Sequence, residues 1–224
     1  PRKMATVDHP GASEGIRVER DGPCARVTLR RPERHNALEA GDVAALNDAL
    51  DGLASDPALR VVILTGAGER TFCSGASLDE MASGEMSGSI FETLTDRLAA
   101  LAVPTVARLN GSVYGGGGEL ALCCDFRVGV RGSRLSVPAA RLGVCYPLGG
   151  LRRYVRRLGP GVASRILLAA EELDAEEMWR TGFLTHLVDR DALDDTVSAL
   201  ADGLASLAPL AVRNMKRILL GITE

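Results

Sequence analysis

The chain has 224 residues, of which 46% are hydrophobic and 25% charged, and its net charge at neutral pH is -3. This length and apolar content suffice for one sizeable core, while the slightly acidic balance and an aromatic content of 4% argue against nucleic acid or an anionic membrane surface as partner. No apolar run is long enough to span a bilayer. The five cysteines show no paired spacing, so we expect reduced thiols, no metal site and a cytoplasmic location.

The first half of the chain alternates between strand and helix patterns. Residues 1–13 lack an apolar signal core and are expected to form a flexible leader. Residues 16–20 and 25–29 alternate apolar and polar side chains around a Gly-Pro turn, which predicts a strand pair. Residues 39–57 carry apolar side chains at helical spacing, and residues 59–68 are a continuous β-branched run typical of a buried strand.

The alternation continues through the middle of the chain. Residues 82–89 are small and polar, which indicates a mobile loop, and residues 91–101 return to helical spacing. Residues 104–114 are expected to form another buried strand. A helix is predicted over 119–124 and a strand over 125–130.

Helical patterns dominate the last third. Residues 135–150 are predicted to be a strand followed by a loop, and most segments from residue 151 onward are helical. We therefore expect an α/β core over residues 14–172 and a helical region over residues 173–224.

The segment "SVYGGGGELALCCDF" at residues 112–126 places four glycines directly before a helix with Glu119 behind them. Glycines let a ligand approach the backbone closely, and the first N–H groups of a helix have no internal partner. Together with the helix dipole they favour an anion, either a phosphate or the negative charge that develops on a carbonyl oxygen. The phosphate alternative is weak, because the run closes with a carboxylate and lacks the lysine of a phosphate-binding loop.

An enolate fits the carboxylate better, since Glu119 could move a proton on the carbon beside a carbonyl group that is held by the amides. Two N–H groups hold a carbonyl oxygen best, so we expect a second loop that donates the other N–H. The segment "FCSGASLDEM" at residues 72–81 also follows a buried strand and carries a glycine before a helix start.

Several separate motifs resemble the crotonase superfamily, the enoyl-CoA hydratase/isomerase family, in order and spacing. They are "RPERHNAL", "VVILTGAGERTFCSGASLDEM", "PTVARLNGSVYGGGGELALCCDF" and, in the C-terminal half, "ARLGVCYPLGG" and "LAPLAVRNMKRIL". The resemblance implies a spiral core of strand–strand–helix units with a C-terminal helical region, here shortened, that assembles homotrimers or hexamers. It also implies an acyl-CoA substrate, with coenzyme A as part of that substrate and no tightly bound cofactor.

Position by position, the resemblance assigns the oxyanion hole to the amides of Ala76 and Gly116 and the acid/base role to Glu119. Tyr146 lies in a loop similar to one in the methylmalonyl-CoA decarboxylase branch, where a tyrosine faces the acyl group. The remaining residues expected to contact substrate are Arg34, His35, Ala37, Gly75, Ser77, Leu78, Asp79, Gly115, Gly117 and Ala139.

The chain departs from the family pattern at three positions: Ser77 stands where the family usually has an aspartate, Pro147 stands where some isomerases have an aspartate, and the third is residue 139. Ala139 follows Pro138 where hydratases carry a second glutamate. A single glutamate suits a 1,3 proton shuttle or hydration with altered helpers, so hydratase and isomerase both stay open. A malonyl-type decarboxylase and a non-catalytic acyl-CoA binder are the alternatives.

Two further stretches have structural interpretations. The basic run "RRYVRR" at residues 152–157 is interpreted as a solvated helix face. Leu200, Leu204 and Leu207 form an apolar stripe that we expect to be covered in a trimer.

Overall fold

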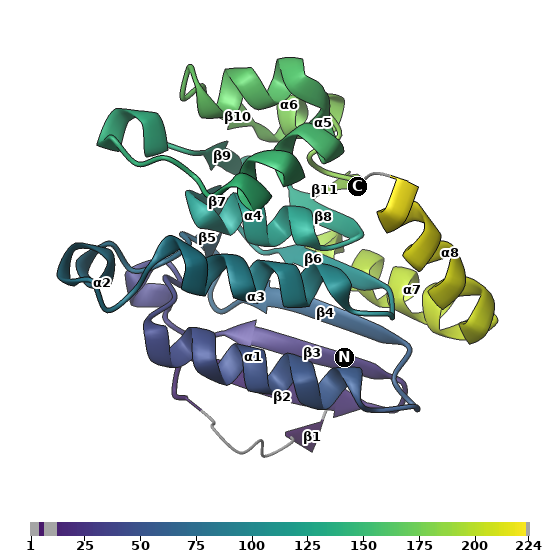
Figure 1. The fold of residues 1–224 in the computed structure, drawn as a ribbon. Coiled ribbons are helices and arrows are strands. Elements are labelled where there is room, and N and C mark those ends of the chain that lie inside the picture. The colour runs from purple at the N-terminus through teal and green to yellow at the C-terminus, as the bar shows by residue number, and fades with distance from the viewer. Residues whose placement is uncertain (1–4, 7–12, 223–224) are drawn as a thin grey trace.

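The computed structural model describes residues 5–6 and 13–222, and it contains two β-sheets flanked by helices (Figure 1). The larger sheet has seven strands in the order β1 (Ala5–Thr6), β2 (Ile16–Asp21), β3 (Cys24–Leu29), β4 (Val61–Gly66), β6 (Thr105–Leu109), β8 (Phe126–Val130) and β11 (His186–Val188). The smaller sheet has four strands in the order β10 (Leu173–Asp174), β9 (Arg134–Ser136), β7 (Ser112–Tyr114) and β5 (Thr71–Cys73). The chain winds as a spiral, because β4, β6 and β8 each enter the larger sheet and are followed by a strand of the smaller one.

A helix closes each turn of this spiral. In chain order the helices are the 3-10 turn η1 (Pro32–Arg34), α1 (Ala40–Ala54), α2 (Leu78–Ser83), α3 (Gly88–Ala100), α4 (Gly116–Cys123), the 3-10 turn η2 (Ala139–Leu142), α5 (Leu148–Leu167), α6 (Ala175–Arg180), the 3-10 turn η3 (Arg190–Ala192), α7 (Leu193–Ser206) and α8 (Pro209–Ile222). The strands β3, β4, β6, β8 and β11 pair in parallel, as strand–helix alternation requires. The expected α/β class is confirmed.

The prediction of one strand over residues 104–114 is wrong, because β6 and β7 belong to different sheets. The break falls at Asn110, which is 1% exposed. Its side-chain amide donates to the carbonyl oxygens of Gly68 and Thr71 at 2.8 and 3.0 Å, and its Oδ1 accepts the N–H of Gly66 at 3.0 Å. These bonds satisfy backbone groups where the chain crosses between the sheets, which an apolar pattern alone does not reveal.

Three other predicted boundaries shift. The helix expected over 119–124 begins earlier, at Gly116, and the expected mobile loop over 82–89 is shortened to residues 84–87, because α2 ends at Ser83 and α3 begins at Gly88. The loop expected up to residue 150 contains η2 and the first residues of α5. In the predicted leader, residues 5–6 pair with β2, while residues 1–4 and 7–12 lie outside the described part of the chain.

The proposed boundary after residue 172 is crossed by strand pairing, since β10 pairs with β9 and β11 pairs with β8. The last third of the chain therefore contributes to both sheets. Leu200 and Leu204 of α7 pack against a core cluster on the larger sheet, together with the buried Leu193 and Val197. The stripe that we expected to need a second subunit is thus mostly covered within this chain, and Leu207 alone is half exposed.

Helix α8 is attached to the core through a charged side chain. Lys216 is 7% exposed, and its ammonium group donates to the carbonyl oxygen of Val103 at 2.8 Å and to Asp125 Oδ2 at 2.7 Å. The same Asp125 oxygen accepts the N–H of Thr105 at 2.9 Å. The last helix is therefore tied to the residue that separates α4 from β8.

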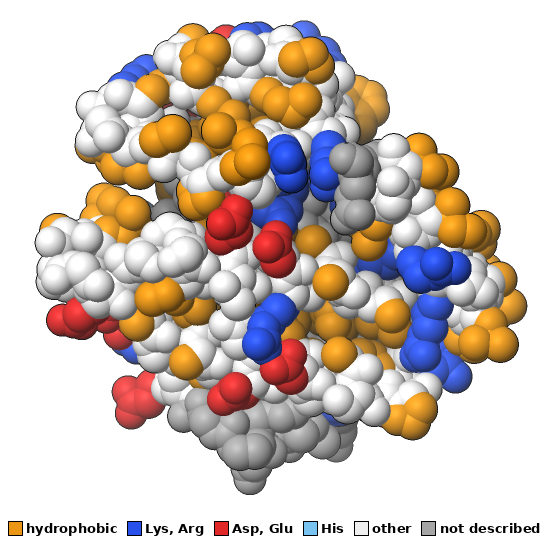
Figure 2. Space-filling model, in the orientation of Figure 1, with side chains coloured by type: hydrophobic (Ala, Val, Ile, Leu, Met, Phe, Trp, Pro, Cys, Tyr) orange, Lys and Arg blue, Asp and Glu red, His pale blue; other side chains and the backbone are white. Residues whose placement is uncertain are grey.

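Along the side of the molecule formed by α8, the side chains of Leu210, Met215, Ile218, Leu219 and Ile222 are exposed. Figure 2 shows hydrophobic side chains gathered on this side of the molecule. Among the described residues, no helix combines the length and the hydropathy that crossing a membrane requires.

Candidate active site

Two loops that leave neighbouring strands of the smaller sheet meet and turn backbone N–H groups toward one pocket. Ala76 pairs with Leu38 in a parallel bridge, in which Leu38 bonds to Gly75 O and Ser77 N, each at 2.8 Å. In such a bridge the N–H of Ala76 itself points to the opposite side. Gly116 opens α4, where an N–H has no partner within the helix. Within the described part of the chain, neither N–H has a hydrogen-bond acceptor.

The glycines permit this close approach. Gly75 has a φ of +89°, and a Cβ added there would lie 2.5 Å from the nitrogen of Gly116. Gly115 has a φ of +49°. A Cβ on Gly117 would lie 2.1 Å from the carbonyl oxygen of Cys73, and one on Gly118 would lie 2.4 Å from the Tyr154 hydroxyl. The glycine run therefore serves two needs: a left-handed turn into α4 and contact of α4 with the loop after β5.

A pocket of about 490 Å³ opens beside these N–H groups. Twelve of the fourteen site residues expected from the sequence line it: Arg34, His35, Ala37, Ala76, Ser77, Leu78, Asp79, Gly115, Gly116, Glu119, Ala139 and Tyr146. Gly75 and Gly117 do not line it, because they lie behind the surface and hold the loops together. The wall is otherwise largely apolar, with Met81, Phe91, Leu142 and Val144 among its members.

Glu119 is 2% exposed and lies one turn into α4. Its Oε1 accepts hydrogen bonds from the Thr95 hydroxyl at 3.0 Å and from Arg153 Nη1 at 2.5 Å. Burial raises the pKa of Glu119 above its usual value, while the charge of Arg153 and the bond from Thr95 act in the opposite direction. The second oxygen of the carboxylate lies against the backbone of Gly150, where an added Cβ would be 2.8 Å away.

Arg153 corrects the interpretation of residues 152–157 as a solvated helix face. Its side chain is 12% exposed and bridges Glu119 and Asp96, with an Nη2 to Oδ1 distance of 2.6 Å to the latter. Arg157 lies 3.9 Å from Asp125. Part of the basic run therefore faces inward and holds carboxylates of α3 and α4.

The raised pKa of Glu119 predicts how stability depends on pH. A carboxyl group whose folded pKa exceeds its unfolded value of about 4.5 destabilises the fold once it ionises, and this cost disappears as the pH falls through the folded pKa. The Glu119→Gln variant, which is neutral at every pH, should therefore have a higher free energy of unfolding than the parent at pH 8, and the difference should shrink toward pH 4. Urea denaturation at both pH values measures this, and a variant less stable than the parent at pH 8 would contradict it.

Tyr146 and Ala139 also line the pocket. The Tyr146 ring makes an edge contact with Tyr154 at a centroid distance of 6.1 Å, and burial together with the charge of Glu119 raises its pKa. Residue 139 has only a methyl side chain. Hydratases of the family that the sequence resembles carry their second glutamate at this position, so here it cannot transfer a proton.

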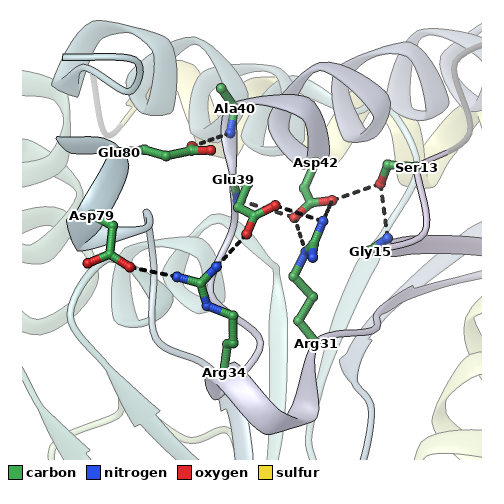
Figure 3. A network of polar contacts seen from close by, with 9 residues as sticks. All are labelled: Ser13, Gly15, Arg31, Arg34, Glu39, Ala40, Asp42, Asp79 and Glu80. Atoms are coloured by element: carbon green, nitrogen blue, oxygen red, sulfur yellow. Dashed lines mark hydrogen bonds and ion pairs between the residues drawn. The ribbon is translucent and has the colours of Figure 1, made fainter. Parts of the chain in front are cut away.

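Arg34 is engaged in a network that joins the start of α1 to α2 (Figure 3). Its guanidinium donates to Glu39 Oε1 at 2.6 Å and to Asp79 Oδ2 at 2.8 Å. In parallel, Glu80 Oε2 accepts the N–H of Ala40 at 2.7 Å. The two contacts fix α2, which follows Ala76 directly, relative to the first turn of α1.

His35 stands at the same rim of the pocket, with its Nδ1 2.8 Å from the Thr71 hydroxyl and its ring edge-on to Tyr114. The structure thus places Arg34 against α2 and His35 against β5 and β7.

Sequence reasoning missed three polar residues around the reaction centre: Glu92, Thr95 and Arg153. Glu92 and Thr95 lie on α3 and Arg153 on α5, and their spacing is that of ordinary amphipathic helices. No local pattern distinguishes them. The one indication in the sequence was that a carboxylate buried on α4 needs hydrogen-bond or ion-pair partners from other elements.

The fold and the site together define an acyl-CoA-processing enzyme of the crotonase type. The chain belongs to the enoyl-CoA hydratase/isomerase family, whose model matches residues 19–221. It is 33% identical over 211 residues to a crotonyl-CoA hydratase of Syntrophomonas wolfei, covering 92% of this chain and 81% of the relative. It is also 35% identical over 217 residues to a carnitinyl-CoA dehydratase of Salmonella enteritidis, with 95% and 82% covered.

A solved structure supports the same assignment. An enoyl-CoA hydratase/carnitine racemase from Magnetospirillum magneticum superposes with a TM-score of 0.89 at 32% identity, covering 95% of this chain and 82% of the other. The crotonase-like spiral expected from the motifs is confirmed.

Proposed function

We propose that this enzyme hydrates or isomerises enoyl-CoA thioesters through an enolate. One observation supports the proposal most directly: two backbone N–H groups that have no acceptor among the described residues, and a buried carboxylate, Glu119, line the same largely apolar pocket. The relatives named crotonyl-CoA hydratase and carnitinyl-CoA dehydratase agree with that chemistry.

In the proposed reaction the thioester oxygen accepts hydrogen bonds from the N–H groups of Ala76 and Gly116. These donors are fixed before the reaction and stabilise the negative charge that forms on the oxygen, which is typically worth about 3 kcal/mol for each donor. Glu119 moves a proton at the carbon beside the thioester. Its burial in an apolar wall lets it hold that proton at a higher pH than a surface glutamate would.

Coenzyme A enters as part of the substrate, and we propose no tightly bound cofactor. The acyl chain would lie between α2 and the segment after η2, along Ala76, Leu78 and Leu142. Arg34 and His35 lie at the rim where the phosphates of coenzyme A are expected. A phosphate bound there would take the place of Asp79 as a partner of Arg34.

A substrate panel tests the proposal: crotonyl-CoA and longer 2-enoyl-CoAs for hydration, 3-enoyl-CoAs for isomerisation, and methylmalonyl-CoA for decarboxylation. We expect turnover of an enoyl-CoA and no release of CO₂. Release of CO₂ without hydration or isomerisation would favour the decarboxylase that the position of Tyr146 suggested. Tight binding across the panel in calorimetry, with no turnover, would favour a non-catalytic binder.

We also propose a homotrimer, or a hexamer made of two trimers, working in the cytoplasm. The exposed apolar side chains of α8 support the assembly, because a face of this kind is normally covered by another subunit. Light scattering that finds a monomer would contradict it.

A further inference from the structure

The acyl pocket contains a second acidic side chain close to the reaction centre, although residue 139 is alanine. Glu92 comes from α3 and lines the pocket together with Glu119 and Tyr146. Its Oε1 accepts the N–H of Gly149 at 2.8 Å, in the first turn of α5.

The two carboxylates lie against consecutive residues of α5. A Cβ on Gly149 would be 2.5 Å from Glu92 Oε1, and a Cβ on Gly150 would be 2.8 Å from Glu119 Oε2. Two glycines in the first turn of α5 leave room for both groups. The charge of Glu92 also contributes to the raised pKa of Glu119, which agrees with their closeness.

The environments of the two carboxylates differ. Glu119 is fully buried, whereas Glu92 is half-buried and also lines a neighbouring groove of about 1190 Å³ between α3, α5 and α8. Glu92 accepts the N–H of Gly149 near the N-terminus of α5, where the helix dipole is positive. Glu92 therefore borders two openings, the acyl pocket and this groove.

We propose that Glu92 is the second proton-transferring carboxylate of this site, supplying from α3 the group that residue 139 lacks, and that the reaction is addition of water to an enoyl-CoA. The proposal rests on the proposed function and specifies its substrate class and second catalytic residue.

The step balances as follows. An O–H bond of water breaks and its proton passes to the Glu92 carboxylate, while the oxygen bonds to the β-carbon. The electrons of the C=C bond move to the thioester oxygen, held by Ala76 and Gly116. Glu119 then gives its proton to the α-carbon and becomes ionised. Proton exchange with solvent returns Glu92 to the carboxylate and Glu119 to the acid.

The first test is Glu92→Gln, because glutamine still accepts the N–H of Gly149 and so keeps any purely structural role. We expect crotonyl-CoA hydration to fall by about 10²- to 10³-fold with KM little changed. Exchange of α-protons of butyryl-CoA with D₂O needs only Glu119, so it should stay within a few-fold of the parent. Glu85→Gln is the control, since Glu85 is an exposed acid in the turn between α2 and α3 and does not line the acyl pocket. It should reduce hydration less than tenfold.

A second pair of variants moves each carboxylate without altering it. Alanine favours helix, so Gly149→Ala and Gly150→Ala should fold even if Glu92→Gln does not. Gly149→Ala should displace Glu92 and impair hydration alone, whereas Gly150→Ala should displace Glu119 and impair both hydration and exchange. Hydration within threefold of the parent in Glu92→Gln or Gly149→Ala would overturn the role of Glu92 and leave the proposed function standing. Full hydration in Glu119→Gln would instead reject the proposed function.

Discussion

Replacing Glu119 with glutamine should lower the turnover of an enoyl-CoA by about 10³-fold or more, while the affinity for the CoA ester stays within a few-fold. Glutamine has the shape of the protonated acid and can keep its contacts with Thr95 and Arg153. It cannot take up or release the proton that must move at the carbon beside the thioester. The loss therefore belongs to kcat and corresponds to about 4 kcal/mol of transition-state stabilisation.

Single-turnover assays with the preferred substrate of the panel, beside calorimetric titration with a saturated acyl-CoA, separate these two quantities. The control is Glu85→Gln, a neutralised acid in the turn between α2 and α3 that does not line the pocket. Turnover by Glu119→Gln at more than a tenth of the parental rate would remove Glu119 from the reaction.

Gly75→Ala should have the second largest effect, a loss of activity of about 10²-fold or more. The added methyl group would lie 2.5 Å from the nitrogen and 2.7 Å from the Cα of Gly116. Both contacts are with backbone, so the loops that carry Ala76 and Gly116 must separate. Two N–H groups that are pushed apart can no longer bond to one oxygen.

Gly84→Ala is the matched control for this substitution. Gly84 has a φ of +85°, close to the +89° of Gly75, but an added Cβ meets nothing within 4 Å. Both variants therefore carry the backbone strain of alanine at positive φ, and only Gly75→Ala adds the collision. Equal losses of activity in the two variants would show that strain, and not separation of the loops, is responsible.

The strands, the helices and the two loops of the site follow from local patterns. The glycine run before Glu119 predicts a backbone that another segment approaches closely, and Gly75 is that segment. The crossing at Asn110 was not predictable from hydropathy, because the apolar residues on both sides are buried in different sheets. An apolar sequence pattern predicts that a residue is buried, but it does not predict which of the two sheets the residue joins.

The polar residues around Glu119 were not predictable for a related reason. Arg153 and Thr95 contact Glu119 from 34 and 24 residues away in the chain, across the packing of α3, α4 and α5. Within its own helix each has the spacing of a surface or core position. Their role follows only because a buried carboxylate needs hydrogen-bond donors, and only the fold shows which residues supply them.

The bond between Lys216 and Asp125 ties α8 to the segment that follows α4, the helix that carries Glu119. Asp125 directly follows the segment Glu119–Cys124 and also fixes the start of β6. If α8 were lost, this carboxylate would lose its 2.7 Å ion pair with Lys216, two residues after the helix that carries Glu119. A variant that ends before α8 should therefore unfold more readily on heating around α4 and β8 as well, and not only where α8 was removed.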